Sequence, residues 1–118
     1  MTWSYNLARF AVWAACTAAA QTTYAQNASE GWRIVLNQRQ GNCAACHSVP
    51  NEAGVKTGIQ STFGPPLDKV ASRYDAPTLR QWVVDARKIN SNTLMPPFST
   101  ILTPQQIDDV LAALQSLR

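Results

Sequence analysis

Hydrophobic residues recur at helical spacing in four segments of this chain, with polar or proline-containing stretches between them. The first segment places Trp32, Val35 and Leu36 on one face of a helix. We expect Ser29 to cap the amino end of this helix, and the pattern stops at Gly41, a residue type that favours helix ends. One amphipathic helix is therefore predicted between Ser29 and Gly41.

The other three segments show the same periodicity. Their apolar positions are Leu67, Val70, Ala71 and Tyr74, then Leu79, Trp82, Val83 and Ala86, and finally Ile107, Val110, Leu111 and Leu114. Asp75 is expected to cap the third helix, and Thr103 opens a capping-box pattern before the fourth. No segment alternates as a strand does, so the sequence predicts an all-α fold of about four short helices, with the last packed against the first.

Residues 1–25 have the features of an export signal rather than of the folded domain. Arg9 is the only charged side chain among them, and residues 10–20 form an uncharged, mostly apolar stretch that is too short to span a bilayer. Small residues at the end of this region suit a signal peptidase, with cleavage after Ala25. The sequence therefore predicts a periplasmic protein whose mature part, residues 26–118, is a single domain with no membrane span.

Other interpretations of the amino-terminal region stay open. Residues 18–20 offer a second cleavage site, directly after the apolar stretch. Cys16 allows a lipoprotein interpretation, although Trp13 occupies a position where a small aliphatic residue is expected. An uncleaved anchor lying in the membrane interface is the third alternative.

The charge pattern argues against nucleic acid as a partner. The formal net charge is only +3, and the chain has no basic run longer than Arg87-Lys88. Beyond residue 25 the lysines are Lys56, Lys69 and Lys88, too few for a dense ring that would steer acidic partners.

Cys43-Ala44-Ala45-Cys46-His47 carries the most specific chemistry in the chain. This spacing is typical of covalent attachment of a c-type haem. The two thiols form thioethers to the vinyl groups of one porphyrin, and His47 supplies the proximal ligand of the iron. The sequence therefore predicts one covalently bound haem c, which agrees with export because this cofactor is attached outside the cytoplasmic membrane.

Rival interpretations of this motif fit less well. A structural zinc site needs four protein ligands, and the mature chain lacks the fourth. A thioredoxin-like dithiol expects a strand and helix around the motif, whereas here a helical pattern precedes it. A disulfide between Cys43 and Cys46 would leave His47 without a role.

The segment Phe63-Gly64-Pro65-Pro66-Leu67 contains two prolines, which favour an extended backbone and lack amide donors. Its carbonyl groups are therefore free to accept hydrogen bonds. A haem-ligating histidine donates from its second ring nitrogen to such an acceptor. The carbonyl of Pro65 is our candidate partner for His47, and an ordinary rigid turn is the equally weighted alternative.

Met95 is the candidate for the second axial ligand. His47 is the only histidine, and Met95 is the only methionine beyond the predicted signal. Pro96 and Pro97 stiffen its loop and lower the entropy lost in holding the sulfur at the metal. A methionine ligand raises the reduction potential. Lysine ligation and an open site remain as alternatives, as does a Met95 that only fills core space. We expect Cys43, Cys46, His47 and Met95 to bound one cavity.

These motifs together resemble a class I cytochrome c over nearly all of the mature chain. Gly64-Pro65-Pro66-Leu67, Ser72-Arg73-Tyr74-Asp75 and the segment from Thr93 to Phe98 are similar to SoxX, the monohaem subunit of the SoxAX complex of thiosulfate oxidation. The resemblance implies a heterodimer with a larger SoxA-like haem subunit that performs the sulfur chemistry. It implies that this chain is a non-catalytic electron-transfer subunit of such an L-cysteine S-thiosulfotransferase, passing electrons to a downstream cytochrome.

Two other functions compete with this one. A free-standing monohaem shuttle, or a partner of another periplasmic dehydrogenase, would also need a haem with two axial ligands. A permanent subunit should expose an apolar patch near the haem edge, whereas a shuttle should expose a charged ring. A haem-based catalyst or gas sensor would require Met95 to be off the iron.

Overall fold

The computed structural model describes residues 25–50 and 61–118, and within these ranges the chain is helical and contains no β-strand. The α-helices are α1 (Ala28–Leu36), α2 (Val70–Arg73), α3 (Ala76–Asp85) and α4 (Pro104–Gln115). Short 3-10 turns are η1 (Cys43–Ala45), η3 (Ala86–Lys88) and η4 (Phe98–Thr100). The predicted all-α class is confirmed, and the predicted export signal lies outside the described residues except for Ala25. None of the helices in this part of the chain is long and apolar enough to cross a bilayer.

Helix α1 begins two residues earlier than the sequence suggested. Its N-cap is Asn27, whose side-chain oxygen accepts from the backbone N–H of Glu30. The expected cap, Ser29, is wrong: its hydroxyl donates to the same Asn27 oxygen at 3.0 Å. The helix also ends before Gly41, because Asn37 adopts an extended backbone and the chain turns there. The N–H of Gly41 then donates a hydrogen bond to the carbonyl oxygen of Ile34 at 3.1 Å.

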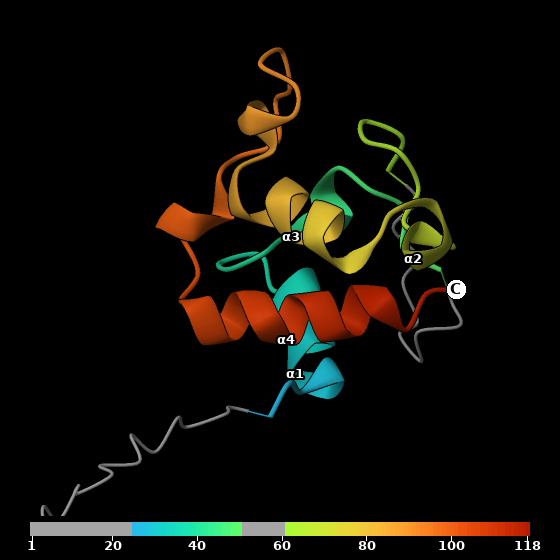
Figure 1. Ribbon diagram of the computed structural model, residues 1–118, viewed down its shortest axis with the longest axis vertical. Coiled ribbons are helices and arrows are strands. Elements are labelled where there is room, and N and C mark those ends of the chain that lie inside the picture. Colours follow the sequence, from blue (N-terminus) through green and yellow to red (C-terminus); the bar gives the residue numbers. More distant parts are fainter. Residues whose placement is uncertain (1–24, 51–60) are drawn as a thin grey trace, which may run out of the picture.

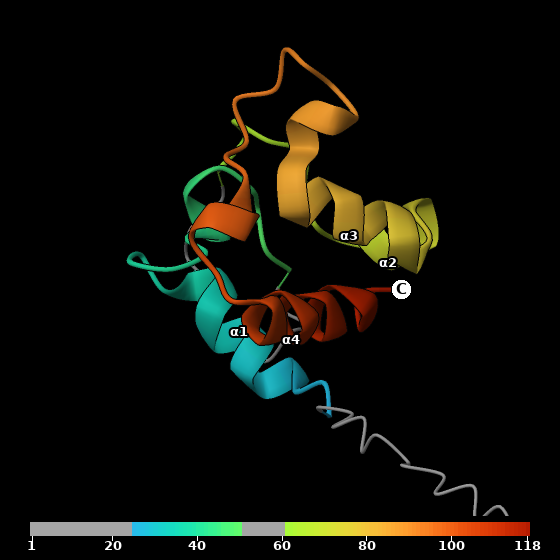
Figure 2. The same cartoon turned by 60° about the vertical axis from the view of Figure 1, so that its left-hand side comes forward.

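Helices α1 and α4 cross at close range, as the sequence predicted (Figures 1 and 2). Gly31 lies at the crossing, and a Cβ built there would lie 1.9 Å from the backbone oxygen of Asp109. The buried Asp109 carboxylate also accepts from the backbone N–H of Asn27 at 2.8 Å. A glycine in mid-helix is therefore required by the packing, because any side chain would drive the two helices apart.

The predicted caps of the last two long helices are present. Asp75 accepts from the N–H of Thr78 at 2.9 Å and opens α3. Thr103 and Gln106 form the full capping box of α4. These local hydrogen bonds satisfy amide groups at helix starts that have no partner inside the helix.

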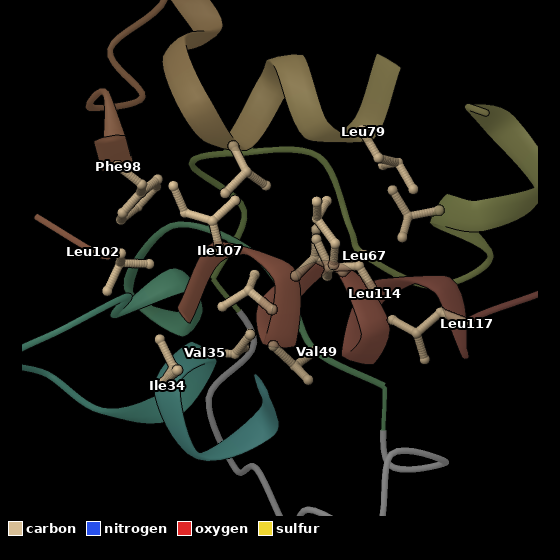
Figure 3. Packing of buried hydrophobic residues seen from close by; sticks show 14 of the residues in the cluster. Ile34, Val35, Val49, Leu67, Leu79, Phe98, Leu102, Ile107, Leu114 and Leu117 are labelled. Carbon is tan, nitrogen blue, oxygen red and sulfur yellow. The ribbon is translucent and has the colours of Figure 1, made fainter. Parts of the chain in front are cut away.

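The hydrophobic core is built around α4, which lies between α1 and α3 (Figures 1 and 3). Its inward residues pack against Ile34 and Val35 of α1 and against Leu79 of α3. The predicted stripe of α3 is buried at Leu79, Val83 and Ala86, but Trp82 keeps part of its surface exposed. The core thus leaves one flank of α3 outside it.

Candidate functional site

The haem-attachment motif follows α1 through a tight turn. Asn42 takes a left-handed backbone conformation with φ of 47°, and η1 begins at the next residue. The N–H of His47 donates to the carbonyl of Cys43 at 2.9 Å, which closes the motif on itself. No disulfide joins Cys43 and Cys46 in this structure. Burial raises the pKa of the Cys43 thiol to about 11.

The imidazole of His47 contacts the carbonyl that the sequence singled out. Its Nδ1 lies 2.6 Å from the backbone oxygen of Pro65. In the tautomer that donates this hydrogen bond, Nε2 carries the free lone pair that a metal requires. Two backbone hydrogen bonds join the haem-attachment motif to the proline-containing segment. Gly64 N–H donates to Cys46 O at 2.6 Å, and Leu67 N–H donates to Ser48 O at 3.0 Å.

Gly64 is a site residue that the sequence reasoning did not identify by role. A Cβ at this position would lie 2.6 Å from Cε1, 2.8 Å from Nδ1 and 3.0 Å from Nε2 of His47. The backbone of Gly64 is therefore flat against the imidazole ring. The signal in the sequence was the glycine directly before two prolines, but our two interpretations of this segment, a carbonyl acceptor for His47 or a rigid turn, gave the glycine itself no role.

A residue of helix α2 also binds the proline-containing segment. The guanidinium of Arg73 donates to the carbonyl of Pro66. Both proline carbonyls of the segment are thus occupied, one by His47 and the other by Arg73. Lys69, which precedes α2, has a positive φ of 51°, so the turn into this helix is tight.

Met95 and His47 line the same cavity, although the chain makes a long excursion between them. This cavity encloses about 350 Å³ of empty space, part of it open to solvent. The residues around it are Gly41, Cys43, His47, Leu67, Val83, Met95, Phe98, Leu102 and Leu114. Three of the four residues expected to bound one cavity do so. Cys46, which is half-buried, is not among the lining residues.

The residues of this site fit a covalent haem. The walls are almost entirely apolar, as a porphyrin requires, and among the described lining residues the side chains with heteroatoms are the potential ligands and attachment points Cys43, His47 and Met95. Gly64 has no side chain to collide with the His47 ring, and Pro65 holds that ring at Nδ1. Among the described residues no three His, Cys, Asp or Glu side chains are grouped to hold a metal ion directly.

The fold and the site define a c-type cytochrome. Residues 28–118 match the family described as Cytochrome c, and the chain belongs to this family. Membership implies a covalently bound haem c and a role in electron transfer. A search of curated protein sequences found no match.

Within this family the chain is a SoxX-like cytochrome. It is 32% identical to a chain in the crystal structure of SoxXA from P. pantotrophus, with a TM-score of 0.69. The superposition covers 81% of this chain and 85% of that chain. The resemblances to class I cytochrome c and to SoxX that the motifs indicated are therefore confirmed.

Proposed function

We propose that this protein is a periplasmic electron-transfer cytochrome with one haem c, held by thioethers to Cys43 and Cys46. His47 is the proximal iron ligand and Met95 the distal one. The observation that carries this proposal is that Cys43, His47 and Met95, from two distant parts of the chain, line one apolar cavity. The bound haem supplies reversible one-electron chemistry.

The protein's own residues set the conditions for that chemistry. Pro65 accepts the Nδ1 proton of His47 at 2.6 Å and so fixes both the tautomer and the plane of the ring. Thr93 accepts the backbone N–H of Met95 at 3.2 Å and shapes the loop that presents the sulfur. The walls, including Leu67, Val83 and Phe98, are apolar and give the site a low-dielectric lining. A soft sulfur ligand together with a low-dielectric environment favours a high reduction potential.

We propose further that the chain is the SoxX-like subunit of a SoxAX-type complex. It would accept electrons from a SoxA-like catalytic subunit of thiosulfate oxidation and pass them to a downstream cytochrome. The likeness to a chain of SoxXA supports this assignment. So does the surface beside the two ligand loops, because Phe63 is 71% exposed and Leu94 is 78% exposed. Phe63 adjoins Gly64, and Leu94 adjoins Met95.

Exposed large apolar residues beside Gly64 and Met95 fit a permanent partner better than a transient one. A shuttle would be expected to carry charged side chains in these places. The protein should therefore copurify from its native host with a larger haem subunit. Recovery of a monomer alone, at all salt concentrations, would contradict the subunit assignment and favour the free-standing shuttle.

Periplasmic location and processing are tested separately. We expect the mature protein to begin at Gln26, and amino-terminal sequencing of protein isolated from the periplasmic fraction measures this directly. A mature chain that begins at Met1, or at Cys16 with an attached lipid, would overturn the predicted signal peptide.

A further inference from the structure

Asp109 is a buried carboxylate without a cation to balance it in the described part of the chain. The residue is only 5% exposed. Its Oδ1 accepts from the backbone N–H of Asn27 at 2.8 Å and from Nε2 of Gln105 at 3.0 Å. None of the ion pairs formed by residues 25–50 and 61–118 includes Asp109. A buried charge is costly unless it is both paired and hydrogen-bonded, so this carboxylate requires a positive partner.

The side-chain amide of Gln105 has a second unmet requirement at the same place. The carboxylate fixes the orientation of this amide, because only its nitrogen can donate to Asp109. Its Oε1 is then inaccessible to solvent and has no hydrogen-bond partner among the described residues. Buried acceptors of this kind are almost always satisfied in folded proteins. One group with a positive charge and several N–H donors, an ammonium, would meet both requirements.

The amino end of α1 balances this charge only in part. A helix carries a partial positive charge at its amino end, and the N-cap residue Asn27 donates its N–H to Asp109. This hydrogen bond ends on Oδ1, as does that of Gln105, and none recorded among residues 25–50 and 61–118 reaches Oδ2. Arg33, the basic residue in the last turn of α1, is already paired with Glu30 at 2.5 Å. Helix α1 therefore supplies no side-chain cation to Asp109.

The residue directly before Asn27 can supply an ammonium once the predicted signal is removed. Cleavage after Ala25 makes Gln26 the first residue, and its nitrogen changes from a neutral peptide N–H into an ammonium with three donors. Consecutive backbone nitrogens are less than about 4 Å apart, so this ammonium lies close to the carboxylate that binds the N–H of Asn27. Gln26 is exposed and precedes α1, so rotation about its own backbone bonds can turn the nitrogen toward Asp109.

We propose that Asp109 and Gln105 form a binding site for the amino terminus of the mature protein, in which the ammonium of Gln26 donates to Asp109 Oδ2 and Gln105 Oε1. This inference rests on the signal cleavage in the proposed function but not on the haem ligands or the SoxAX assignment. Processing then adds an ion pair at the crossing of α1 and α4, where Gly31 already brings the two helices into backbone contact. The unprocessed chain lacks this ion pair, so removal of the signal stabilises the fold.

The test compares two forms of the haem-loaded protein, one that begins at Gln26 and one in which Gly-Ser precedes Gln26. Both are exported behind the same foreign signal peptide, and the intact mass confirms where each begins. The extension moves the ammonium away from Asp109 without changing any side chain of the domain. Each form is combined with Asp109→Asn, which removes the charge and keeps an oxygen acceptor for Asn27. Asp108→Asn is the matched control, because it removes the same charge from the next position of α4, where it pairs with Arg80 of α3.

We expect the extension to lower the midpoint of thermal unfolding, Tm, by about 4–8 °C in the wild type and in Asp108→Asn. In Asp109→Asn the extension should leave the Tm nearly unchanged, because the ammonium has no carboxylate to lose. A wild-type Tm that is insensitive to the extension would overturn the proposal. An equal fall in Asp109→Asn would overturn it too, by showing that the extension acts sterically.

A second measurement needs no substitution and covers the case in which Asp109→Asn does not fold. At neutral pH, acetic anhydride should acetylate the amino group of the form that begins at Gln26 several-fold more slowly than that of the extended form, because a paired ammonium keeps its proton. Equal rates would overturn the proposal. A Gln26 that has cyclised with loss of ammonia, as shown by the intact mass, would overturn it too, because the cyclic residue has no ammonium.

The start of the protein isolated from its native host is a separate result. A mature chain that begins elsewhere than Gln26 would count against the predicted signal peptide, whereas the two forms of defined start test the site formed by Asp109 and Gln105. The two failures are therefore distinguishable.

Discussion

Gly64 lies flat against the imidazole of His47, so close that a methyl group at Gly64 would lie 2.6 Å from Cε1 of the ring. The same ring is held at Nδ1 by the carbonyl of Pro65, the next residue. Gly64 and Pro65 therefore restrict the orientation of the His47 ring in two ways: Gly64 contacts the face of the ring, and Pro65 accepts a hydrogen bond in its plane. Gly64 is needed here for close approach, not for an unusual backbone conformation.

The first prediction is that Gly64→Ala displaces the His47 ring and weakens its bond to iron. Overpacking of this kind costs about 1–3 kcal/mol of unfolding free energy. Guanidinium denaturation of the haem-loaded protein measures this loss, and resonance Raman spectroscopy of the ferrous form measures the histidine–iron bond. Phe63→Ala is the matched control, because it changes the neighbouring residue at an exposed side chain and should alter stability by less than about 0.5 kcal/mol. Equal stability and equal histidine–iron bond strength in the two variants would contradict the close contact between Gly64 and the His47 ring.

The second prediction concerns the distal ligand. Met95→Ala should lower the reduction potential and abolish the methionine-to-iron charge-transfer band, because the soft sulfur ligand is lost. The reduced variant should then bind carbon monoxide rapidly. Leu94→Ala is the control, since Leu94 is the neighbouring residue and its side chain is exposed. Retention of the band in Met95→Ala would show that Met95 is a core residue and that another group, or none, occupies the sixth position.

The third prediction tests the crossing of α1 and α4. Gly31→Ala places a Cβ 1.9 Å from the backbone oxygen of Asp109, and backbone atoms of a packed helix cannot move aside cheaply. We expect a loss of about 3 kcal/mol or more in unfolding free energy, measured by guanidinium denaturation. Ser29→Ala, on the exposed face of the same helix, should change the free energy by less than about 1 kcal/mol. A Gly31→Ala variant as stable as the wild type would contradict the close crossing.

The sequence predicted the parts of this protein that depend on local rules. The capping box at Thr103 and the cap at Asp75 are short-range hydrogen bonds, and both are present. The cap of α1 was misplaced because Ser29 and Asn27 both satisfy the local rule. Tertiary structure decides between them: the backbone N–H of Asn27 is tied to Asp109, far along the chain.

Apart from the packing of α4 against α1, contacts between distant segments were predicted only where ligand chemistry required them. A histidine that binds iron needs an acceptor for its second nitrogen, and this requirement singled out the Pro65 carbonyl. No comparable requirement pointed to Gly64, whose importance depends on the distance between its backbone and the imidazole ring of His47. The indole Nε1 of Trp82 is buried and has no hydrogen-bond partner among the described residues, whereas helical periodicity predicted only that this residue belongs to the buried face of its helix.

The fourth prediction is that Lys69→Gly stabilises the protein. Lys69 has a φ of 51°, in the left-handed region that residues with a Cβ adopt at a cost of about 1–2 kcal/mol. Glycine adopts it freely but loses more backbone entropy on folding, so we expect a net gain of about 0.5–1 kcal/mol. Thermal and guanidinium unfolding measure the gain. Lys88→Gly removes the same charge from a 3-10 turn without positive φ, and this control should be destabilised. Destabilisation of both variants would contradict the strained turn.

The fifth prediction concerns pH. Hydrogen bonds from Thr78 lower the pKa of the Asp75 carboxyl below its ordinary value of 3.8. Because this pKa is lower in the folded protein, the ionised cap contributes stability above pH 3.8, and the contribution is lost as the pH falls through the folded-state pKa. Asp75→Asn keeps a cap of similar strength that does not titrate. Near neutral pH the two proteins should therefore unfold at nearly the same guanidinium concentration, and below about pH 4 the wild type should become the less stable. Glu30 and Asp85 titrate alike in both proteins, so the difference between the two unfolding curves isolates Asp75. A difference that stays constant from neutral to acid pH would show that the carboxylate does not cap α3.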